Sequence, residues 1–360
     1  MNDNRRLMKG NEAFAEASIV AGCRYYFGYP ITPQNEIIEY MSRELSGAGG
    51  EFIQAESEIA AISMGIGATA AGGKVMITSS SPGVALMQEG LSFLCSADLP
   101  LVLLNVSRGG PGVGGIQPGQ ADYFQATRGG GNGDYHLIVY APATIQESID
   151  TIQKAFSIAE EYSNPVMLLV DGMLGQMMEP VLMPGRTTEH TNSDTEAAKP
   201  WALTGHGDVR DVNVVRSLRL KPNELENSIT SRRDKYQKAE RELTEYELKN
   251  IEDAEVVFVA FGTTSRIIQD AMDLLKDQGL NVGLIRPKTL WPFPYKAFDE
   301  ISDKTKVVIS VELSEGQLIQ DVKLGVNGRY PVSLINRTGG MLLSPEEIAE
   351  RTMVILGEVR

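Results

Sequence analysis

The first half of the chain alternates short apolar runs with stretches in which apolar positions recur at helical spacing. The runs at 25–28, 52–54, 74–78, 100–106, 136–140 and 166–170 predict buried strands, and the stretches at 11–21, 58–71, 84–96 and 144–161 predict helices. Continuous apolar strands between helices indicate a parallel sheet that is covered on both faces. Because ligands bind beyond the carboxyl ends of such strands, the loops 28–33, 78–83 and 107–120 are expected to meet at one edge.

The pattern changes after residue 185. Residues 186–250 hold few apolar positions, and the charged stretch 224–250 predicts a solvated helix within a long connector. Apolar strands return at 255–261, 282–285, 307–311 and 332–335, with helices at 263–277 and 345–356. We therefore expect an α/β protein with a doubly wound parallel-sheet domain at 1–185, a connector at 186–250 and a smaller α/β domain at 251–360.

Charge and composition narrow the possible functions. The 360 residues carry a net charge of −14, which argues against a nucleic-acid partner because phosphate contacts need clustered Lys and Arg. Cys23 and Cys95 are isolated and the three histidines are scattered, so this chain is not expected to hold an iron–sulfur cluster or a zinc ion. No apolar run reaches the roughly 18 residues that span a bilayer, and the polar start lacks a signal-peptide core. We expect a cytoplasmic protein with no membrane contact.

An acidic residue opens the predicted helix 58–71. Glu58 is followed by Ile59, Ala60 and Ala61, so its side chain is expected to be partly desolvated at a helix start built from small residues. A carboxylate in that place can face a cofactor that approaches the backbone closely, or it can be an ordinary acid of the first helical turn. Glu56 is the rival candidate and is expected to be the more exposed of the two.

The loop Tyr29-Pro30-Ile31-Thr32-Pro33 follows the strand at 25–28. Thr32 suits a helix N-cap and Pro33 suits the first helical position. Such a helix start could receive an anion such as a carboxylate, or Thr32 could serve only as a cap.

Arg108 follows the apolar strand at 100–106 and opens a glycine-rich loop that is predicted at 108–133. A cation at a strand end is well placed to grip a carboxylate, although a solvated loop arginine explains the position equally well. The loop lacks the lysine of a phosphate-binding loop, so its glycines do not indicate a phosphate site. The segment Ser79-Ser80-Ser81-Pro82-Gly83 places hydroxyls at a third strand end, where they could bind a ligand or could only stabilise a turn. His136 opens an apolar strand and is expected to have a structural role.

Several motifs, taken jointly, resemble the α subunit of 2-oxoacid:ferredoxin oxidoreductases, and more narrowly that of the branched-chain, 2-oxoisovalerate type. They are Tyr29–Pro33, Glu56–Glu58, Arg108–Pro111, Gln120–Tyr123, Gly129–Tyr135, Arg286–Phe293 and Glu312–Gln317. The resemblance covers nearly the whole chain, least of all the connector. It implies a thiamine-diphosphate-type pyrimidine-binding domain followed by a domain like the C-terminal domain of transketolase.

The resemblance also implies roles for individual residues. Glu58 would hydrogen-bond the N1′ atom of the thiamine aminopyrimidine, so that the protein orients and polarises the cofactor. Thr32 and Arg108 would hold the carboxylate and the carbonyl of the substrate. Further cofactor-binding positions would be Pro30, Ile31, Ser80 and Ser81.

The implied reaction is the oxidative decarboxylation of a branched 2-oxo acid with coenzyme A, giving an acyl-CoA, carbon dioxide and reduced ferredoxin. The sequence shows no GDG…N segment for Mg²⁺ and diphosphate, and no cysteines for a cluster. The resemblance therefore implies that Mg²⁺, the diphosphate half of thiamine diphosphate and the 4Fe-4S clusters lie on other subunits. These would be a thiamine-diphosphate-binding β subunit, a γ subunit and a ferredoxin-like δ subunit, with the site at a subunit interface.

One short segment bears on which 2-oxo acid the resemblance implies. Gln34-Asn35 stands where many relatives with other substrates carry Ser-Thr or Ser-Ser, which favours the branched-chain type over the 2-oxoglutarate type. A 2-oxoglutarate enzyme should supply a second cation, for which Lys74 and Arg128 are the loop candidates. Two further alternatives stay open: a thiamine enzyme that uses no ferredoxin, and a non-catalytic α/β scaffold subunit in which Glu58 is only a helix acid.

Overall fold

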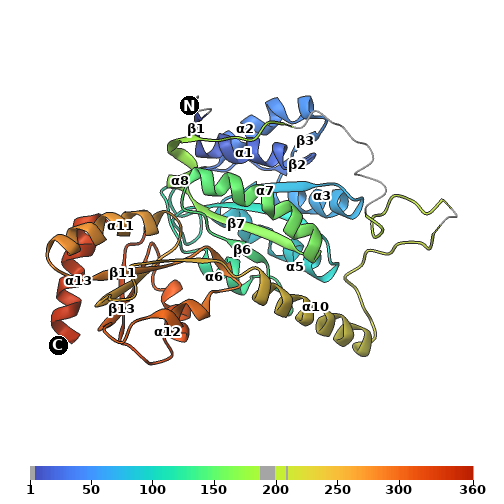
Figure 1. Ribbon diagram of the computed structural model, residues 1–360. Coiled ribbons are helices and arrows are strands. Elements are labelled where there is room, and N and C mark those ends of the chain that lie inside the picture. Colours follow the sequence, from blue (N-terminus) through green and yellow to red (C-terminus); the bar gives the residue numbers. More distant parts are fainter. Residues whose placement is uncertain (1–4, 187–198, 208–209, 360) are drawn as a thin grey trace.

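The computed structural model describes residues 5–186, 199–207 and 210–359 (Figure 1). Its larger sheet has seven strands. These strands are β2 (Tyr25–Gly28), β3 (Glu51–Gln54), β4 (Val75–Ser79), β5 (Leu101–Ser107), β6 (Ile138–Tyr140), β7 (Pro165–Asp171) and β12 (Thr289–Trp291). Their order is β12-β6-β7-β5-β4-β2-β3, and every neighbouring pair is parallel except β12 with β6. β4, β5 and β7 are buried along their whole lengths, as their continuous apolar sequences predict.

Helices cover both faces of this sheet. α1 (Gly10–Val20), α2 (Asn35–Glu44) and α7 (Ile145–Tyr162) form one packed group, and α3 (Glu58–Ala70), α4 (Ser81–Leu86) and α5 (Gln88–Ser96) form another. Smaller elements are η1 (Ser46–Ala48), α6 (Tyr123–Arg128), α8 (Gly172–Gln176) and the antiparallel pair of β1 (Arg6–Lys9) with β8 (Met178–Val181). The predicted doubly wound α/β arrangement is confirmed.

The loops singled out in the sequence meet at one edge of the large sheet. β2, β4 and β5 are parallel neighbours that end at Gly28, Ser79 and Ser107. β3 runs parallel to β2, so the start of α3 reaches the same edge. We call this end of the sheet the carboxyl edge.

The second sheet has five strands in the order β14-β13-β10-β11-β9. They are β9 (Tyr246–Lys249), β10 (Val256–Val259), β11 (Val282–Pro287), β13 (Val307–Glu312) and β14 (Val332–Asn336), and β9 alone among them runs antiparallel to its neighbour. Its helices are α11 (Gly262–Asp277), η2 (Tyr295–Glu300), α12 (Leu318–Val326) and α13 (Pro345–Val359).

The two sheets are joined by a strand and an ion-pair cluster. β12 directly follows β11 of the second sheet in the chain, but it pairs with β6 of the first sheet. Just before it, the Arg286 guanidinium donates to Glu147 of α7 at 2.9 Å and to Glu247 of β9 at 2.8 Å. Trp291 of β12 stacks on His136 with ring centroids 4.6 Å apart, a structural role of the kind expected for this histidine. α10 (Pro222–Glu242) runs beside the first domain, where Lys235 pairs with Asp98 at 2.7 Å (Figure 1).

Two predicted helices have other boundaries. The helix predicted from Thr32 begins at Asn35, because the carbonyls of Thr32 and Pro33 accept hydrogen bonds from side chains of other elements. The predicted helix 224–250 ends at Glu242, since the residues of β9 pair with β11.

Other local differences lie near the carboxyl edge. The loop predicted at 108–133 contains α6, and the single helix predicted at 84–96 is the pair α4 and α5, which meet at Met87. The sequence pattern also gave no signal for β1, β8, β12, α8 or α12, whose short lengths leave too few residues to establish a period.

Candidate active site

Glu58 is the first residue of α3, as predicted. Ser57 precedes it in an extended conformation, and the Ser57 hydroxyl accepts a hydrogen bond from Ala60 N at 3.1 Å. Because Ser57 caps the helix, Glu58 is not needed for capping. Its side chain is 5% exposed, whereas Glu56 is exposed, and the expected contrast between the two acids is confirmed.

The Glu58 carboxylate lies against the end of β4. A Cβ placed on Gly83 would come within 2.5 Å of Glu58 Oε1 and 2.2 Å of Ser79 Oγ, so glycine is needed for both groups to fit. Among the described residues none donates a hydrogen bond to this carboxylate, and the buried hydroxyls of Ser79 and Ser80 also have no partner. Buried polar groups are nearly always paired, so an unpaired acid beside unpaired hydroxyls indicates a place for a polar ligand.

Arg108 is 7% exposed at the end of β5. Its Nη1 donates to the Thr32 carbonyl at 2.7 Å and its Nη2 donates to the Val113 carbonyl at 2.9 Å. Its Nε is buried and has no partner in the described part of the chain. The structure thus brings Arg108 and Thr32 together, and both of the groups that hold the guanidinium are neutral carbonyls rather than carboxylates.

Thr32 does not cap a helix, so the predicted helix start at Thr32 is wrong. Thr32 and Pro33 are joined by a cis peptide bond and form a turn, and the N-cap position belongs to Gln34. The Pro33 carbonyl accepts hydrogen bonds from Asn11 Nδ2 at 2.7 Å and from Gln176 Nε2 at 2.9 Å. These bonds hold the Thr32 loop in place without making it helical.

Ser81 is engaged within the protein. Its hydroxyl donates to Asp122 Oδ2 at 2.6 Å and accepts from Arg108 N at 2.9 Å, and Asn105 Nδ2 donates to the same Asp122 oxygen at 2.9 Å. Burial raises the pKa of Asp122 above its usual value, although these hydrogen bonds oppose the rise. Ser81 therefore fixes the backbone of Arg108. Sequence reasoning missed Asp122 and Asn105, because only the fold brings them beside Ser81.

Gln34 belongs to the segment that favours a branched-chain substrate, and it is fully buried. Its Oε1 accepts from Thr78 Oγ1 at 2.6 Å, and its Nε2 donates to the Tyr29 carbonyl at 3.4 Å. The Thr78 hydroxyl also lies 2.5 Å from the Tyr26 hydroxyl. Gln34 thus braces the Tyr29–Pro33 loop against β4.

Apolar side chains face solvent around the carboxyl edge. Tyr29, Ile53, Ile59, Ile116 and Val113 are 38%, 44%, 55%, 58% and 81% exposed. Pro30 is exposed as well, and Ile31 is half-buried. We call these residues the apolar rim. Clustered exposed apolar side chains are typical of interaction surfaces.

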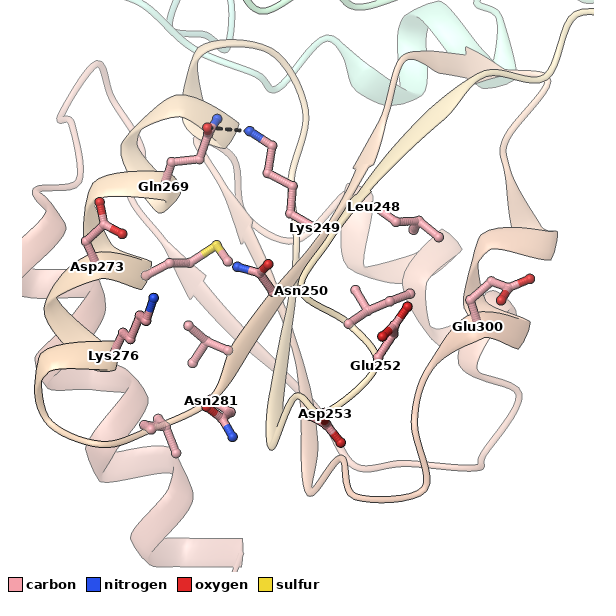
Figure 2. Close-up of a pocket in the computed structure, with 14 residues that line it drawn as sticks. Leu248, Lys249, Asn250, Glu252, Asp253, Gln269, Asp273, Lys276, Asn281 and Glu300 are labelled. Atoms are coloured by element: carbon pink, nitrogen blue, oxygen red, sulfur yellow. Dashed lines mark hydrogen bonds between the residues drawn. The ribbon is translucent and has the colours of Figure 1, made fainter.

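A sizeable cavity lies away from the carboxyl edge. It has a volume of about 750 Å³ and lies at the amino-terminal ends of β10 and β11 (Figure 2). Its polar lining residues include Lys249, Asn250, Glu252, Asp273, Lys276 and Glu300. Lys249 Nζ donates to Gln269 Oε1 at 2.6 Å across one wall. None of the site residues predicted from the sequence lines this cavity, so its size alone does not make it the active site.

The described part of the chain offers neither a membrane-spanning helix nor a metal site. No helix in 5–186, 199–207 or 210–359 is long and apolar enough to cross a membrane. Within those same ranges no group of His, Cys, Asp and Glu side chains could hold a metal ion.

Family models match both domains. Residues 16–257 match the thiamine-diphosphate-binding domain of pyruvate flavodoxin/ferredoxin oxidoreductases, and residues 254–348 match core domain II of pyruvate:ferredoxin oxidoreductase. Ketoisovalerate oxidoreductase subunit VorB of Methanothermobacter marburgensis is 45% identical over 98% of both chains. The 2-oxoglutarate synthase subunit KorA of Methanocaldococcus jannaschii is 36% identical, covering 95% of this chain and 97% of the relative.

Solved structures show the same fold. A 2-oxoglutarate:ferredoxin oxidoreductase from Magnetococcus marinus, with 2-oxoglutarate, coenzyme A and succinyl-CoA bound, has a TM-score of 0.85 and 28% identity. The match covers 99% of this chain and 66% of that chain. A split-gene transketolase has a TM-score of 0.57 at 13% identity, a likeness of fold alone. The chain belongs to the 2-oxoacid:ferredoxin oxidoreductase family, as an α-type subunit with the thiamine-diphosphate-binding domain.

Proposed function

We propose that this subunit supplies the pyrimidine half of a shared thiamine diphosphate site and acts in the coenzyme A-dependent oxidative decarboxylation of a branched-chain 2-oxo acid. The observation that carries the proposal is Glu58, a residue that is 5% exposed and whose carboxylate has no hydrogen-bond donor among the described residues. The electrons go to ferredoxin.

The residues around Glu58 fit an aminopyrimidine. A ring nitrogen that donates to Glu58 would supply the missing partner, and polar atoms of the ring could pair with the hydroxyls of Ser79 and Ser80. Thiamine diphosphate, when bound, supplies the carbanion chemistry of decarboxylation. Glu58 holds the proton at N1′ and so polarises the ring, while Gly83 lets the carboxylate lie close to the end of β4. We retain Pro30, Ile31 and Ser80 as cofactor-binding residues and give Ser81 a positioning role.

Arg108 and Thr32 form the substrate end of the proposed site. The Arg108 guanidinium is buried, holds only neutral carbonyls and has an unpaired Nε, so a carboxylate in reach of it would form a charge-assisted bond. The Thr32 side chain is half-buried in the same loop and can donate its hydroxyl to the substrate carbonyl.

The partner subunits complete the site. The apolar rim supports this, because side chains up to 81% exposed beside a buried carboxylate suit an interface that closes over them. A β subunit would bind the diphosphate and Mg²⁺, and the 4Fe-4S clusters would lie on other subunits of the complex.

The branched-chain substrate is supported by the ketoisovalerate relatives and by the surroundings of two cations. A 2-oxoglutarate enzyme needs a second cation for the distal carboxylate. Arg128 is held by Asp321 at 2.7 Å, and Lys74 lies at the start of β4, away from the carboxyl edge. The 2-oxoglutarate relatives keep that substrate as the second candidate.

A substrate panel on the complete complex, purified without oxygen, tests the proposal. Coenzyme A-dependent reduction of a low-potential dye is followed with 2-oxoisovalerate, 2-oxoglutarate and pyruvate. The highest kcat/KM is expected with 2-oxoisovalerate. A preference for 2-oxoglutarate would replace the substrate and keep the site, whereas no reduction with any of them, in a preparation that contains iron and all subunits, would refute the reaction.

A further inference from the structure

A turn of the second domain reaches the carboxyl edge of the first. Gly339 and Gly340 lie between β14 and α13 and have φ angles of 64° and 87°. A Cβ placed on Gly340 would come within 2.4 Å of Gln117 Cβ, and a Cβ on Gly109 would lie 3.4 Å from Gly340 N. Position 340 therefore needs glycine for its backbone conformation and for its close approach to the loop after Arg108.

Gln117 and Gly109 close the base of that loop. Gly109 N donates to the Gln117 carbonyl at 2.9 Å, and Arg108 forms an isolated β-bridge with Pro118. Farther along the same loop, the Val113 carbonyl accepts from Arg108 Nη2 at 2.9 Å. Since the base and the carbonyl belong to one short loop, a displacement of Gln117 also displaces the group that orients the guanidinium.

The end of the loop rests on the second domain too. Gln120 is 2% exposed, and its backbone N donates to the Leu313 carbonyl at 2.9 Å. Its side chain donates to the Phe261 carbonyl at 3.0 Å and accepts from Leu313 N at 3.1 Å and Thr264 Oγ1 at 2.9 Å. This amide uses donor and acceptor alike, and every partner lies in the second domain.

We propose that the second domain positions Arg108 for the substrate carboxylate, by clamping the loop 109–119 between the Gly339-Gly340 turn and the Gln120 anchor. This inference rests on the proposed role of Arg108. In it Arg108 is the residue that touches substrate, whereas Gly340 and Gln120 are positioning residues. The second domain then influences the affinity for the 2-oxo acid, in addition to its packing contacts with the first domain.

The test is Gly340→Ala in the assembled complex, with the KM values for 2-oxoisovalerate and coenzyme A measured separately. The new methyl group displaces the loop, so the KM for the 2-oxo acid is expected to rise about tenfold, since small misplacements of a binding group are costly. The KM for coenzyme A stays unchanged. Gly339→Ala is the matched control: it carries the same kind of backbone strain in the same turn, but its methyl group meets nothing within 4 Å.

A second change should restore affinity. Gln117→Gly removes the atom that the new methyl group would strike, so Gly340→Ala with Gln117→Gly is expected to recover most of the lost affinity. Gln120→Ala, which removes the other anchor, should raise the same KM and serves if Gly340→Ala fails to assemble.

Three results would overturn the inference. They are an unchanged KM for the 2-oxo acid in Gly340→Ala, equal changes in Gly339→Ala and Gly340→Ala, and a parallel rise in the KM for coenzyme A. Arg108→Lys distinguishes a failure of the proposed role of Arg108 from a failure of the clamp on the loop 109–119. If it leaves the KM for the 2-oxo acid unchanged, the proposed role of Arg108 fails and the inference fails with it; if it raises that KM while Gly340→Ala does not, only the clamp is refuted.

Discussion

Two buried glutamates stand at junctions of strand and helix, one in each domain, and their surroundings are opposite. Glu312 ends β13 and is 1% exposed. It accepts hydrogen bonds from the backbone N–H groups of Gln317 at 2.8 Å, Leu318 at 3.0 Å and Ile319 at 3.0 Å, and from the Ser310 and Ser314 hydroxyls. Glu58 accepts none within the described ranges. Glu312 fills its acceptor positions from within the fold, whereas those of Glu58 are open for the proposed ligand.

The comparison teaches how to interpret a motif match. Glu56–Glu58 and Glu312–Gln317 both belong to the motifs on which the family resemblance stands. One motif leaves a carboxylate open beside unpaired hydroxyls, and the other closes the start of α12. Hydrogen-bond satisfaction therefore separates a residue placed for chemistry from one that stabilises the fold, and sequence similarity does not.

The largest effect should come from Glu58→Gln. The amide keeps the shape of the side chain but removes the negative charge, so turnover of the assembled complex is expected to fall by at least about 100-fold, the scale of proton-transfer catalysis. The Tm should stay close to that of the wild type, because no hydrogen bond of the described fold is lost. Dye reduction and differential scanning calorimetry measure the two quantities. Glu56→Gln is the control and should keep full activity; turnover near the wild-type rate in Glu58→Gln would contradict the assignment.

Arg108→Lys should have the next largest effect. Lysine keeps the positive charge but cannot make the paired contacts of a guanidinium. Without the guanidinium, the Thr32 and Val113 carbonyls lose their hydrogen-bond donor. The KM for the 2-oxo acid is expected to rise about 10-fold or more, in line with the loss of a charge-assisted hydrogen bond. Steady-state kinetics with varied 2-oxoisovalerate measures it. A change confined to kcat would show that Arg108 does not grip the ground-state substrate.

Glu312→Gln should lower stability and leave turnover unchanged, the reverse of the result expected for Glu58→Gln. The amide nitrogen faces backbone donors, so the unfolding free energy is expected to fall by about 1.5–3 kcal/mol, the range for hydrogen bonds to a charged group. Thermal unfolding of the complex would record this loss as a lower Tm. Activity per folded complex should stay normal. Strong inactivation without loss of Tm would mean that Glu312 also serves the reaction.

The smallest expected effect is the pH dependence of the stability contributed by the Glu147–Arg286 ion pair between the two domains. Burial alone would raise the pKa of Glu147, but the Arg286 guanidinium outweighs it and holds that pKa below its usual value. A lowered folded-state pKa adds stability above the unfolded-state pKa, and this stability is lost as the pH falls through the folded-state value. The Tm difference between wild type and Glu147→Gln should therefore be largest at neutral pH and shrink on acidification. A constant difference would show that the ion pair does not contribute.

The sequence predicts most strands of the two sheets, but it does not predict their order. The continuous apolar runs of β4, β5 and β7 specify buried strands, and their parallel pairing confirms the edge at which the loops meet. β12 is three residues long and pairs with a strand about 150 residues earlier in the sequence, so nothing local predicts it.

The candidate site also contains residues that local sequence predicts and residues that only the fold brings together. Glu58 could be found because the acid, the small residues and the helix start are neighbours in sequence. The helix start at Thr32 failed because hydrogen bonds from Asn11 and Arg108 override the local preference for a cap. Asp122 and the clamp on the loop 109–119 could not be predicted, since their partners are distant in sequence.

The most direct test of the central claim follows the thiazolium C2 proton of thiamine diphosphate bound to the complete complex. Its exchange for deuterium is quenched and read by NMR in wild type, Glu58→Gln and Glu312→Gln, each at the same occupancy of cofactor. Glu58→Gln should slow the exchange by at least about 100-fold, the contribution typical of a positioned acid–base group, while Glu312→Gln exchanges at the wild-type rate. Equal exchange in wild type and Glu58→Gln would contradict the account, because the open carboxylate would then not act on the cofactor.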